Sequence, residues 1–256
     1  MTATVFIIVI FIFATFIGSF LNVCIYRIPR EESIVFPGSH CPECGTTIKP
    51  YDLVPVLSWV FLRGKCRTCG TAISPRYPAV ELLTGILIAL VYMKYGLTIP
   101  FILVSFLTLH LVVMTFIDLD HQIIPDGLTM LVAAGGVVNV AYGRISGSGL
   151  TIGQAALGIL IGGGFFLVIA IVSNGGMGGG DIKLMAALGL WFGWQGILLV
   201  MFLSFIIGGV VSVGLLIARK AGRKQMVPFG PFIAIGAYLT AVYGIEIIHW
   251  YFSHFM

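Results

Sequence analysis

The chain has 256 residues, of which 59% are hydrophobic and only 9% are charged. Soluble domains carry charge on roughly a quarter of their residues, so this composition excludes an ordinary water-soluble protein. The formal net charge of +4 is explained by basic residues distributed around a membrane, so we expect membrane lipid and no nucleic acid among the partners.

Apolar stretches near the ~20-residue length that crosses a bilayer recur along the chain. They predict an all-α polytopic membrane protein of about eight transmembrane helices, at residues 4–26, 80–96, 99–117, 127–142, 151–173, 182–194, 196–218 and 229–250. The first stretch has no basic residue before it and no small-residue cleavage site after it, so we interpret it as an uncleaved helix. The sixth stretch is the shortest, and Gly193 interrupts it.

The basic residues predict the orientation of these helices, because short cytoplasmic loops retain Lys and Arg. In an eight-helix arrangement, one side of the membrane carries twelve of the fourteen basic residues, and the other side carries only Lys94 and Arg144. Both termini are therefore expected outside, and the loop that follows the first helix is expected in the cytoplasm. Three regions result: a first helix at 1–28, a cytoplasmic loop domain at 29–78 and a membrane core of about seven helices at 79–256.

The loop domain contains four of the five cysteines, in two C-x-x-C-G motifs separated by 21 residues. Four thiolates at this spacing can form a closed tetrahedral zinc site, which is typical of structural and not of catalytic zinc. A disulfide is disfavoured in a reducing cytosol, while a redox pair and unligated thiols remain alternatives. A loop of about 50 residues with little apolar content needs a cross-link such as a bound metal ion to fold. The predicted ligands are Cys41, Cys44, Cys66 and Cys69.

Among only ten acidic residues, carboxylates at the edge of apolar helices suggest function. The third predicted helix runs inward and ends at Asp118, and the sixth begins at Asp181 on the same cytoplasmic side. Two carboxyls at one depth on different helices can share a proton, as an aspartyl protease requires: one activates water and the other protonates the peptide carbonyl. The sequence therefore predicts Asp118 and Asp181 as a catalytic pair.

Other carboxylates have structural explanations. Asp126 follows Pro125 at the start of the fourth helix and is expected to be its N-cap. Asp120 faces away from Asp118 if the helix continues, and it is the first alternative member of the pair. Glu81 is expected in the first turn of the second helix, where interaction with the helix dipole is a sufficient explanation.

A run of three glycines precedes Asp181, and a cap alone does not explain it. Without side chains, Gly178, Gly179 and Gly180 would let a substrate backbone approach the carboxylate, although a flexible linker is an alternative. The helix dipoles further predict that Asp118, at a helix C-terminus, retains the shared proton, while Asp181, at an N-terminus, stays ionised.

Taken together, the chain resembles the type IV prepilin peptidases, GxGD-type intramembrane aspartyl proteases that are also N-methyltransferases. The similarity spans nearly the whole chain. Its motifs, in the expected order, are Gly18-Ser19-Phe20-Leu21-Asn22-Val23, Tyr26-Arg27-Ile28-Pro29, Ser39-His40-Cys41-Pro42, Tyr77-Pro78, Glu81-Leu82-Leu83-Thr84-Gly85, Ile117-Asp118 to Pro125-Asp126, Gly178-Gly179-Gly180-Asp181 and Pro228-Phe229-Gly230-Pro231-Phe232.

This resemblance implies a function in the prokaryotic cytoplasmic (inner) membrane, with the active site at its cytoplasmic face. The expected activity is cleavage of the basic leader of type IV prepilins or pseudopilins after a glycine, followed by N-methylation with S-adenosylmethionine as donor. Asp118 and Asp181 correspond to the family's catalytic aspartates, and Gly64 and Lys65 to positions associated with methylation.

Two other functions compete with this one. A polytopic ion-coupled transporter would explain boundary aspartates and glycine-rich breaks, but not the tetracysteine loop. A zinc-dependent membrane protease would need a catalytic motif such as H-E-x-x-H, which the sequence lacks.

Overall fold

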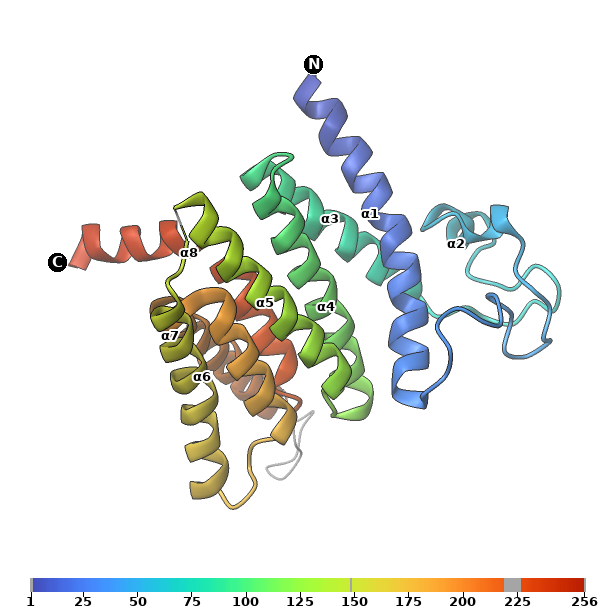
Figure 1. The fold of residues 1–256 in the computed structure, drawn as a ribbon. Coiled ribbons are helices and arrows are strands. Elements are labelled where there is room, and N and C mark those ends of the chain that lie inside the picture. The colour runs from blue at the N-terminus through green and yellow to red at the C-terminus, as the bar shows by residue number, and fades with distance from the viewer. Residues whose placement is uncertain (1, 148, 219–226, 256) are drawn as a thin grey trace. The chain divides into compact units, whose positions relative to one another are not determined.

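A computed structural model describes residues 2–147, 149–218 and 227–255 (Figure 1). Within these residues, all named secondary-structure elements are helices, and seven of them are long and apolar enough to cross a membrane. The prediction of an all-α polytopic membrane protein is therefore confirmed.

The elements are α1 (Thr2–Arg27), the short α2 (Leu57–Phe61), α3 (Arg76–Tyr95), α4 (Ile99–His121), α5 (Asp126–Ser146), α6 (Ile152–Val172), α7 (Gly179–Ile217) and α8 (Gly230–Phe255), with 3₁₀ turns at Ile28–Arg30 and Pro50–Leu53.

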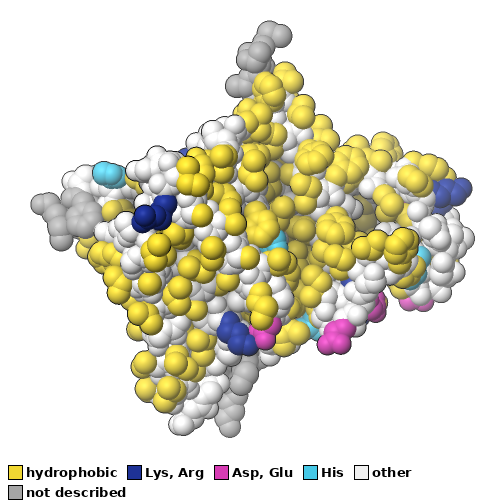
Figure 2. All heavy atoms as spheres, in the orientation of Figure 1, with side chains coloured by type: hydrophobic (Ala, Val, Ile, Leu, Met, Phe, Trp, Pro, Cys, Tyr) yellow, Lys and Arg dark blue, Asp and Glu magenta, His cyan; other side chains and the backbone are white. Residues whose placement is uncertain are grey.

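Large apolar side chains cover much of the surface of these helices (Figure 2). Phe13 in α1 is 68% exposed and Val210 in α7 is 69% exposed. Soluble monomers rarely expose wide apolar patches, whereas lipid is the natural partner for such side chains. The chain is a multi-pass membrane protein.

The sixth and seventh predicted helices are the two parts of α7. Its 39 residues contain one non-helical position, Gly193, at φ 61° and ψ −172°. A Cβ placed on Gly162 of α6 would touch both the Met185 backbone and the Ile197 side chain. In a straight helix these two residues would be about 18 Å apart, so the chain must reverse at Gly193. Because α7 contains two of the eight predicted apolar stretches, seven continuous helices contain all eight.

The chain forms two compact units, residues 1–113 and 114–256. In the first unit, α1 packs against α3 through small residues. Gly18 faces the backbone of Glu81, and Gly85 faces Phe11 and Thr15. Close approach of this kind is typical of helix pairs in membranes, where small residues let the backbones meet.

In the second unit, α7 packs against α5, α6 and α8. The contact with α6 depends on Gly158 and Gly189, because a Cβ on either would overlap the backbone of the other helix. Trp191 fixes the contact with α5: its indole N–H donates to the Val132 carbonyl at 2.7 Å, and its own carbonyl accepts from Asn139 at 3.2 Å. These contacts hold the first half of α7, which begins at the predicted site.

Candidate functional site

The two C-x-x-C-G motifs have the same local fold, repeated after 25 residues. The Gly45 N–H donates to the Cys41 carbonyl, as the Gly70 N–H does to the Cys66 carbonyl. The Ile48-to-Ser39 and Ile73-to-Gly64 backbone bonds correspond in the same way. Both glycines have left-handed φ values, 68° and 74°, which glycine adopts without steric cost. Each motif is thus a tight knuckle that turns both of its thiols to one side.

The two knuckles bring the predicted metal ligands together. The sulfur atoms of Cys41, Cys44, Cys66 and Cys69 all lie within 4.8 Å of one another, and Cys41 Sγ and Cys69 Sγ are 3.8 Å apart. A tetrahedral zinc ion with bonds of about 2.3 Å requires sulfurs roughly 3.8 Å apart. The Thr71 hydroxyl lies 3.3 Å from Cys69 Sγ, and hydrogen bonding by Thr71 lowers the pKa of this thiol to about 6. The donor set therefore fits zinc.

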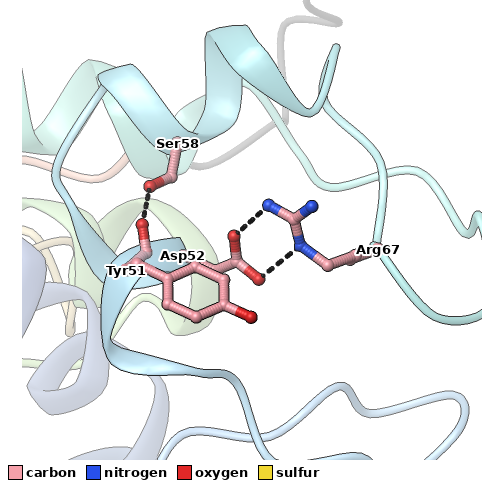
Figure 3. Close-up of polar contacts among 4 residues, drawn as sticks. All are labelled: Tyr51, Asp52, Ser58 and Arg67. Carbon is pink, nitrogen blue, oxygen red and sulfur yellow. Dashed lines mark hydrogen bonds and ion pairs between the residues drawn. The ribbon is translucent and has the colours of Figure 1, made fainter.

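An ion pair fixes the second knuckle to the preceding loop. Arg67 lies between the two cysteines of that knuckle, and it donates from Nε and Nη2 to the two Asp52 oxygens at 2.8 and 2.6 Å (Figure 3). These hydrogen bonds from Arg67 hold the pKa of Asp52 below its usual value. The neighbouring Tyr51 carbonyl accepts from the Ser58 hydroxyl at 2.9 Å. The 3₁₀ turn is thus held between α2 and the knuckle.

Gly64 and Lys65 begin the second knuckle, where they correspond to Ser39 and His40 of the first. Lys65 forms an isolated bridge with Ala72, and the Gly64 carbonyl accepts from Ile73. Gly64 has a φ of 65°, and a Cβ there would lie 2.8 Å from the Trp59 ring. The Trp59 indole donates to the Ile73 carbonyl at 3.0 Å. Gly64 therefore supports the position of Trp59.

Asp118 lies in the last turn of α4 and is buried, with 5% exposure. The helix ends because Gln122 takes a left-handed φ of 54° and donates its N–H to the Asp118 carbonyl at 2.9 Å, an αL-type C-cap. The Asp118 carboxylate accepts the backbone N–H of Gly230 at 2.9 Å. Gly230 is the first residue of α8, so this carboxylate meets the N-terminus of a second helix.

Asp181 is in the first turn of α7, whose N-cap is Gly178. Its carboxylate reaches back toward the backbone of Gly178. Asp181 is the third helical residue, the position whose side chain faces the N-cap amide in a capping box. A glycine at the cap leaves space around the carboxylate, because a Cβ on Gly178 would lie 3.1 Å from Asp181 Oδ2.

Asp118 and Asp181 line one cavity of about 240 Å³ in the second unit, and their carboxyls are close enough to interact electrostatically. Asp120, the alternative partner, is exposed and does not line this cavity. Asp126 lines it, and both of its oxygens accept from Lys183 Nζ at 2.8 Å. The end of α4, the start of α5 and the start of α7, which the sequence predicts on the cytoplasmic side, thus meet around two carboxyls.

The three glycines differ in their surroundings. A Cβ on Gly179 would meet no atom within 4 Å, and one on Gly178 would meet only Asp181. A Cβ on Gly180 would lie 2.9 Å from Ile124 Cβ. The first two glycines leave open space beside the carboxylate, while Gly180 is required by packing within the protein.

Two expectations from the sequence were wrong. The N-cap of α5 is Pro125, with no side-chain cap, and Asp126 instead pairs with Lys183. Glu81 is beyond the first turn of α3, which begins at Arg76, and its carboxylate accepts the Val56 backbone N–H at 2.7 Å. Both acidic side chains form contacts between segments that lie far apart in the sequence, and helix-terminal preferences do not reveal such contacts.

The prediction that Asp118 retains the shared proton was based on helix dipoles, and it did not consider the start of α8. It considered only the helix that carries each aspartate, whereas Asp118 also faces the N-terminus of α8 through Gly230. Asp118 therefore lies between the C-terminus of α4 and the N-terminus of α8, whose fields act in opposite senses, while Asp181 lies at the N-terminus of α7. Helix direction alone no longer separates their roles. The motif around Gly230 was visible in the sequence, but nothing local linked it to Asp118, 112 positions away.

Comparison with known proteins agrees with these features. The model of the Bacterial Peptidase A24 N-terminal domain matches residues 12–95, and that of the Type IV leader peptidase family matches residues 105–213. Proteins named "Prepilin leader peptidase/N-methyltransferase" are similar to the chain over nearly its full length. The protein from Aeromonas hydrophila is 36% identical, covering 96% of this chain and 94% of its own.

The Bacillus subtilis protein of that name is also 36% identical, covering 95% of this chain and 96% of its own. The Pseudomonas aeruginosa protein is 34% identical, covering 92% of this chain and 89% of its own. No solved structure matches the chain. The two family models match in consecutive order, and the relatives extend across both. The chain belongs to the type IV leader peptidase family.

Proposed function

We propose that this protein cleaves the leader peptide of type IV prepilins or pseudopilins after a glycine and then N-methylates the new N-terminus. The reaction would take place at the cytoplasmic face of the inner membrane, where the basic leader lies. The proposal is supported by relatives of that name over nearly the full chain. It is also supported by the single cavity that Asp118 and Asp181 share.

In the proposed hydrolysis, the two aspartates act as one acid and one base. An ionised carboxylate takes a proton from water as the water oxygen attacks the scissile carbonyl carbon. The protonated carboxyl donates its proton to the carbonyl oxygen. Burial of Asp118 beside a second carboxyl favours a shared proton, because two like charges at close range do not both ionise readily.

The glycine run supports access of an extended peptide to this pair. Gly178 and Gly179 leave room beside the Asp181 carboxylate, so a substrate backbone can approach without meeting a side chain. Asp126 and Lys183 form an exposed ion pair on the same cavity. We assign this pair to holding the start of α5 near α7.

The loop domain is proposed to hold one structural zinc ion and to take part in methylation. Cys41, Cys44, Cys66 and Cys69 have the separations that a tetrahedral thiolate site needs. The proposed methyl donor is S-adenosylmethionine. Gly64 contributes through the placement of Trp59, and Lys65 through its backbone bridge with Ala72 in the second knuckle.

The decisive experiment uses purified full-length protein and a synthetic peptide with a basic leader and a glycine at the cleavage point. Asp118→Asn and Asp181→Asn should each lower cleavage by roughly 10²–10⁴-fold, the usual contribution of a general acid or base. Asp120→Asn is the matched control, since it is the same change two positions away and outside the cavity. Mass spectrometry of the product measures cleavage. Near-normal cleavage by either of the first two variants would require a different catalytic pair.

The transporter hypothesis gains no support from the relatives, which carry a peptidase name. The same cleavage experiment separates the two functions. If ion flux in proteoliposomes depended on Asp118 and Asp181 while a prepilin-like peptide stayed intact, the protein would be a transporter and the peptidase proposal would fail.

A further inference from the structure

A second cavity, of about 620 Å³, lies in the first unit between the loop domain and the adjoining ends of α1 and α3. Its wall includes three aromatic side chains, Tyr26, Trp59 and Tyr77, and the carboxylate of Glu81. Asn22 also lines it and donates to the Tyr77 carbonyl at 3.1 Å. Helices and loop therefore line one cavity, and none of its lining residues also lines the aspartate cavity.

The wall of this cavity includes buried polar groups. Glu81 is 7% exposed and Asn22 is 8% exposed, although both lie in helices of membrane-spanning length. Val56 has a φ of 61° and a ψ of −52°, and its N–H points to the Glu81 carboxylate. A left-handed φ is a true outlier for a β-branched residue, and such strain clusters at functional sites. Glu81 thus fixes a strained segment at the cavity wall.

We propose that this 620 Å³ cavity is the binding site for the methyl donor, with Trp59 and Glu81 as the side chains that recognise it. The inference rests on the proposed methylation activity and gives it a location. Sites for small organic ligands usually measure about 300–1,000 Å³. The loop-domain cavity lies within that range, and the aspartate cavity, at about 240 Å³, lies below it.

The lining also suits the chemistry of this donor. S-adenosylmethionine supplies a methyl group on a sulfonium, which transfers to a neutral amine, leaving a neutral thioether and releasing one proton from the methylated nitrogen. Aromatic rings attract cations and stack on heterocycles, and Trp59 is one of the aromatic residues that line the cavity. The Glu81 carboxylate complements a positively charged ligand.

The position of Gly64 supports the same assignment. Gly64 does not line the cavity, but a Cβ there would press on the Trp59 ring, which does. Gly64 would therefore affect donor binding through Trp59, without touching the donor. The pairing of Gly64 with a cavity-lining aromatic gives this glycine a physical role that its place in the sequence does not reveal.

The test begins with the unmodified, zinc-loaded, full-length protein and sinefungin, a stable analogue of the donor. Hydrogen–deuterium exchange with and without sinefungin should show protection in residues 20–27 and 54–62. Residues 119–126 and 176–182, around the aspartates, should stay unchanged. Protection at the aspartates, or no binding by a preparation that methylates its substrate, would overturn the inference.

Variants then test the recognising side chain. Glu81→Gln keeps the size of the side chain but removes its charge, and it should weaken sinefungin binding about tenfold or more. Glu31→Gln, an exposed carboxylate outside the cavity, is the matched control and should bind normally. Zinc content measured for each variant verifies that the loop is folded. Equal affinity of the folded Glu81→Gln variant and the parent would remove Glu81 from the site.

The outcomes also separate this inference from the proposed function. If the protein cleaves and methylates its substrate but sinefungin protects another region, the location is wrong and the function stands. If sinefungin protects this cavity but the protein neither cleaves nor methylates, the proposed function fails and the binding site stands. If the leader peptide protects residues 20–27 and 54–62 and sinefungin does not, the cavity belongs to the peptide substrate and the donor site is overturned.

Discussion

Gly230 donates its backbone N–H to the Asp118 carboxylate at 2.9 Å, across 112 positions of sequence. The residue before it, Phe229, packs among Phe166, Phe205 and Phe232, with ring centroids 5.4–5.9 Å apart. This cluster fixes the start of α8 and therefore the amide that faces the carboxylate. The P-F-G-P-F motif thus has a concrete role in holding Asp118.

Replacing Gly230 with alanine should disturb this contact. The added Cβ would lie 2.7 Å from Asp118 Oδ2, so either the carboxylate or the helix must move. A shift of about 1 Å in a catalytic group can cost roughly 10²-fold in rate, and we expect a loss of that order in peptide cleavage. Gly209→Ala is the control, because its Cβ would meet no atom within 4 Å. Full activity of Gly230→Ala would show that this amide does not position Asp118.

Removal of zinc should affect the two proposed activities unequally. Freshly purified protein should contain about one equivalent of zinc, and Cys66→Ser should lower this content and make the loop more sensitive to protease. Methylation should fall more than cleavage, because Asp118 and Asp181 lie on other segments. Cys24→Ser, in the buried face of α1, is the control. Metal-free protein from a chelator-free preparation would contradict the zinc site, and equal loss of both activities would contradict their separation.

Gly64 and Gly70 allow a matched comparison within one knuckle. Both have left-handed φ values, 65° and 74°, but only a Cβ on Gly64 would meet another group, the Trp59 ring. Alanine at either position should cost about 1–2 kcal/mol of backbone strain. Only Gly64→Ala should also weaken sinefungin binding, by roughly tenfold, with zinc content as the measure of folding. Similar affinity of the two variants would mean that Trp59 does not carry the effect.

Arg67→Lys should separate geometry from charge in the loop. The variant keeps the positive charge but loses the two-pronged contact with Asp52, which requires a planar guanidinium. We expect faster hydrogen exchange in residues 50–53 by severalfold, with unchanged zinc content, since the cysteine ligands remain. Exchange equal to that of the parent protein would show that the ion pair does not order this turn.

Much of the fold could be predicted from the sequence because membrane helices are encoded locally. Long apolar runs identified the helices, and Gly193 marked the break within α7. The cysteine spacing indicated the ligand set, which the structure brings within 4.8 Å. Asp118 and Asp181 could be paired from topology alone, since alternating crossings place both at one predicted membrane face.

Other features could not be predicted because they depend on contacts between distant segments. Helix-terminal rules gave Asp126 and Glu81 local explanations, but their carboxylates bind Lys183 and the Val56 amide. The 25-residue repeat in the knuckles does not depend on such contacts: residues 41–50 and 66–75 share six of ten side chains, so the sequence itself carries it.

The reversal at Gly193 also determines at which end of the helices α8 can begin. A straight helix of 39 residues would be about 58 Å long, nearly twice the ~30 Å hydrocarbon core. The part of α7 after Gly193 doubles back along α6, so it leads the chain toward the level at which Asp181 begins. The start of α8 then belongs to the side on which Gly230 can meet Asp118. If the turn were straightened, both aspartates would remain, but the amide that orients one of them would start from the wrong side.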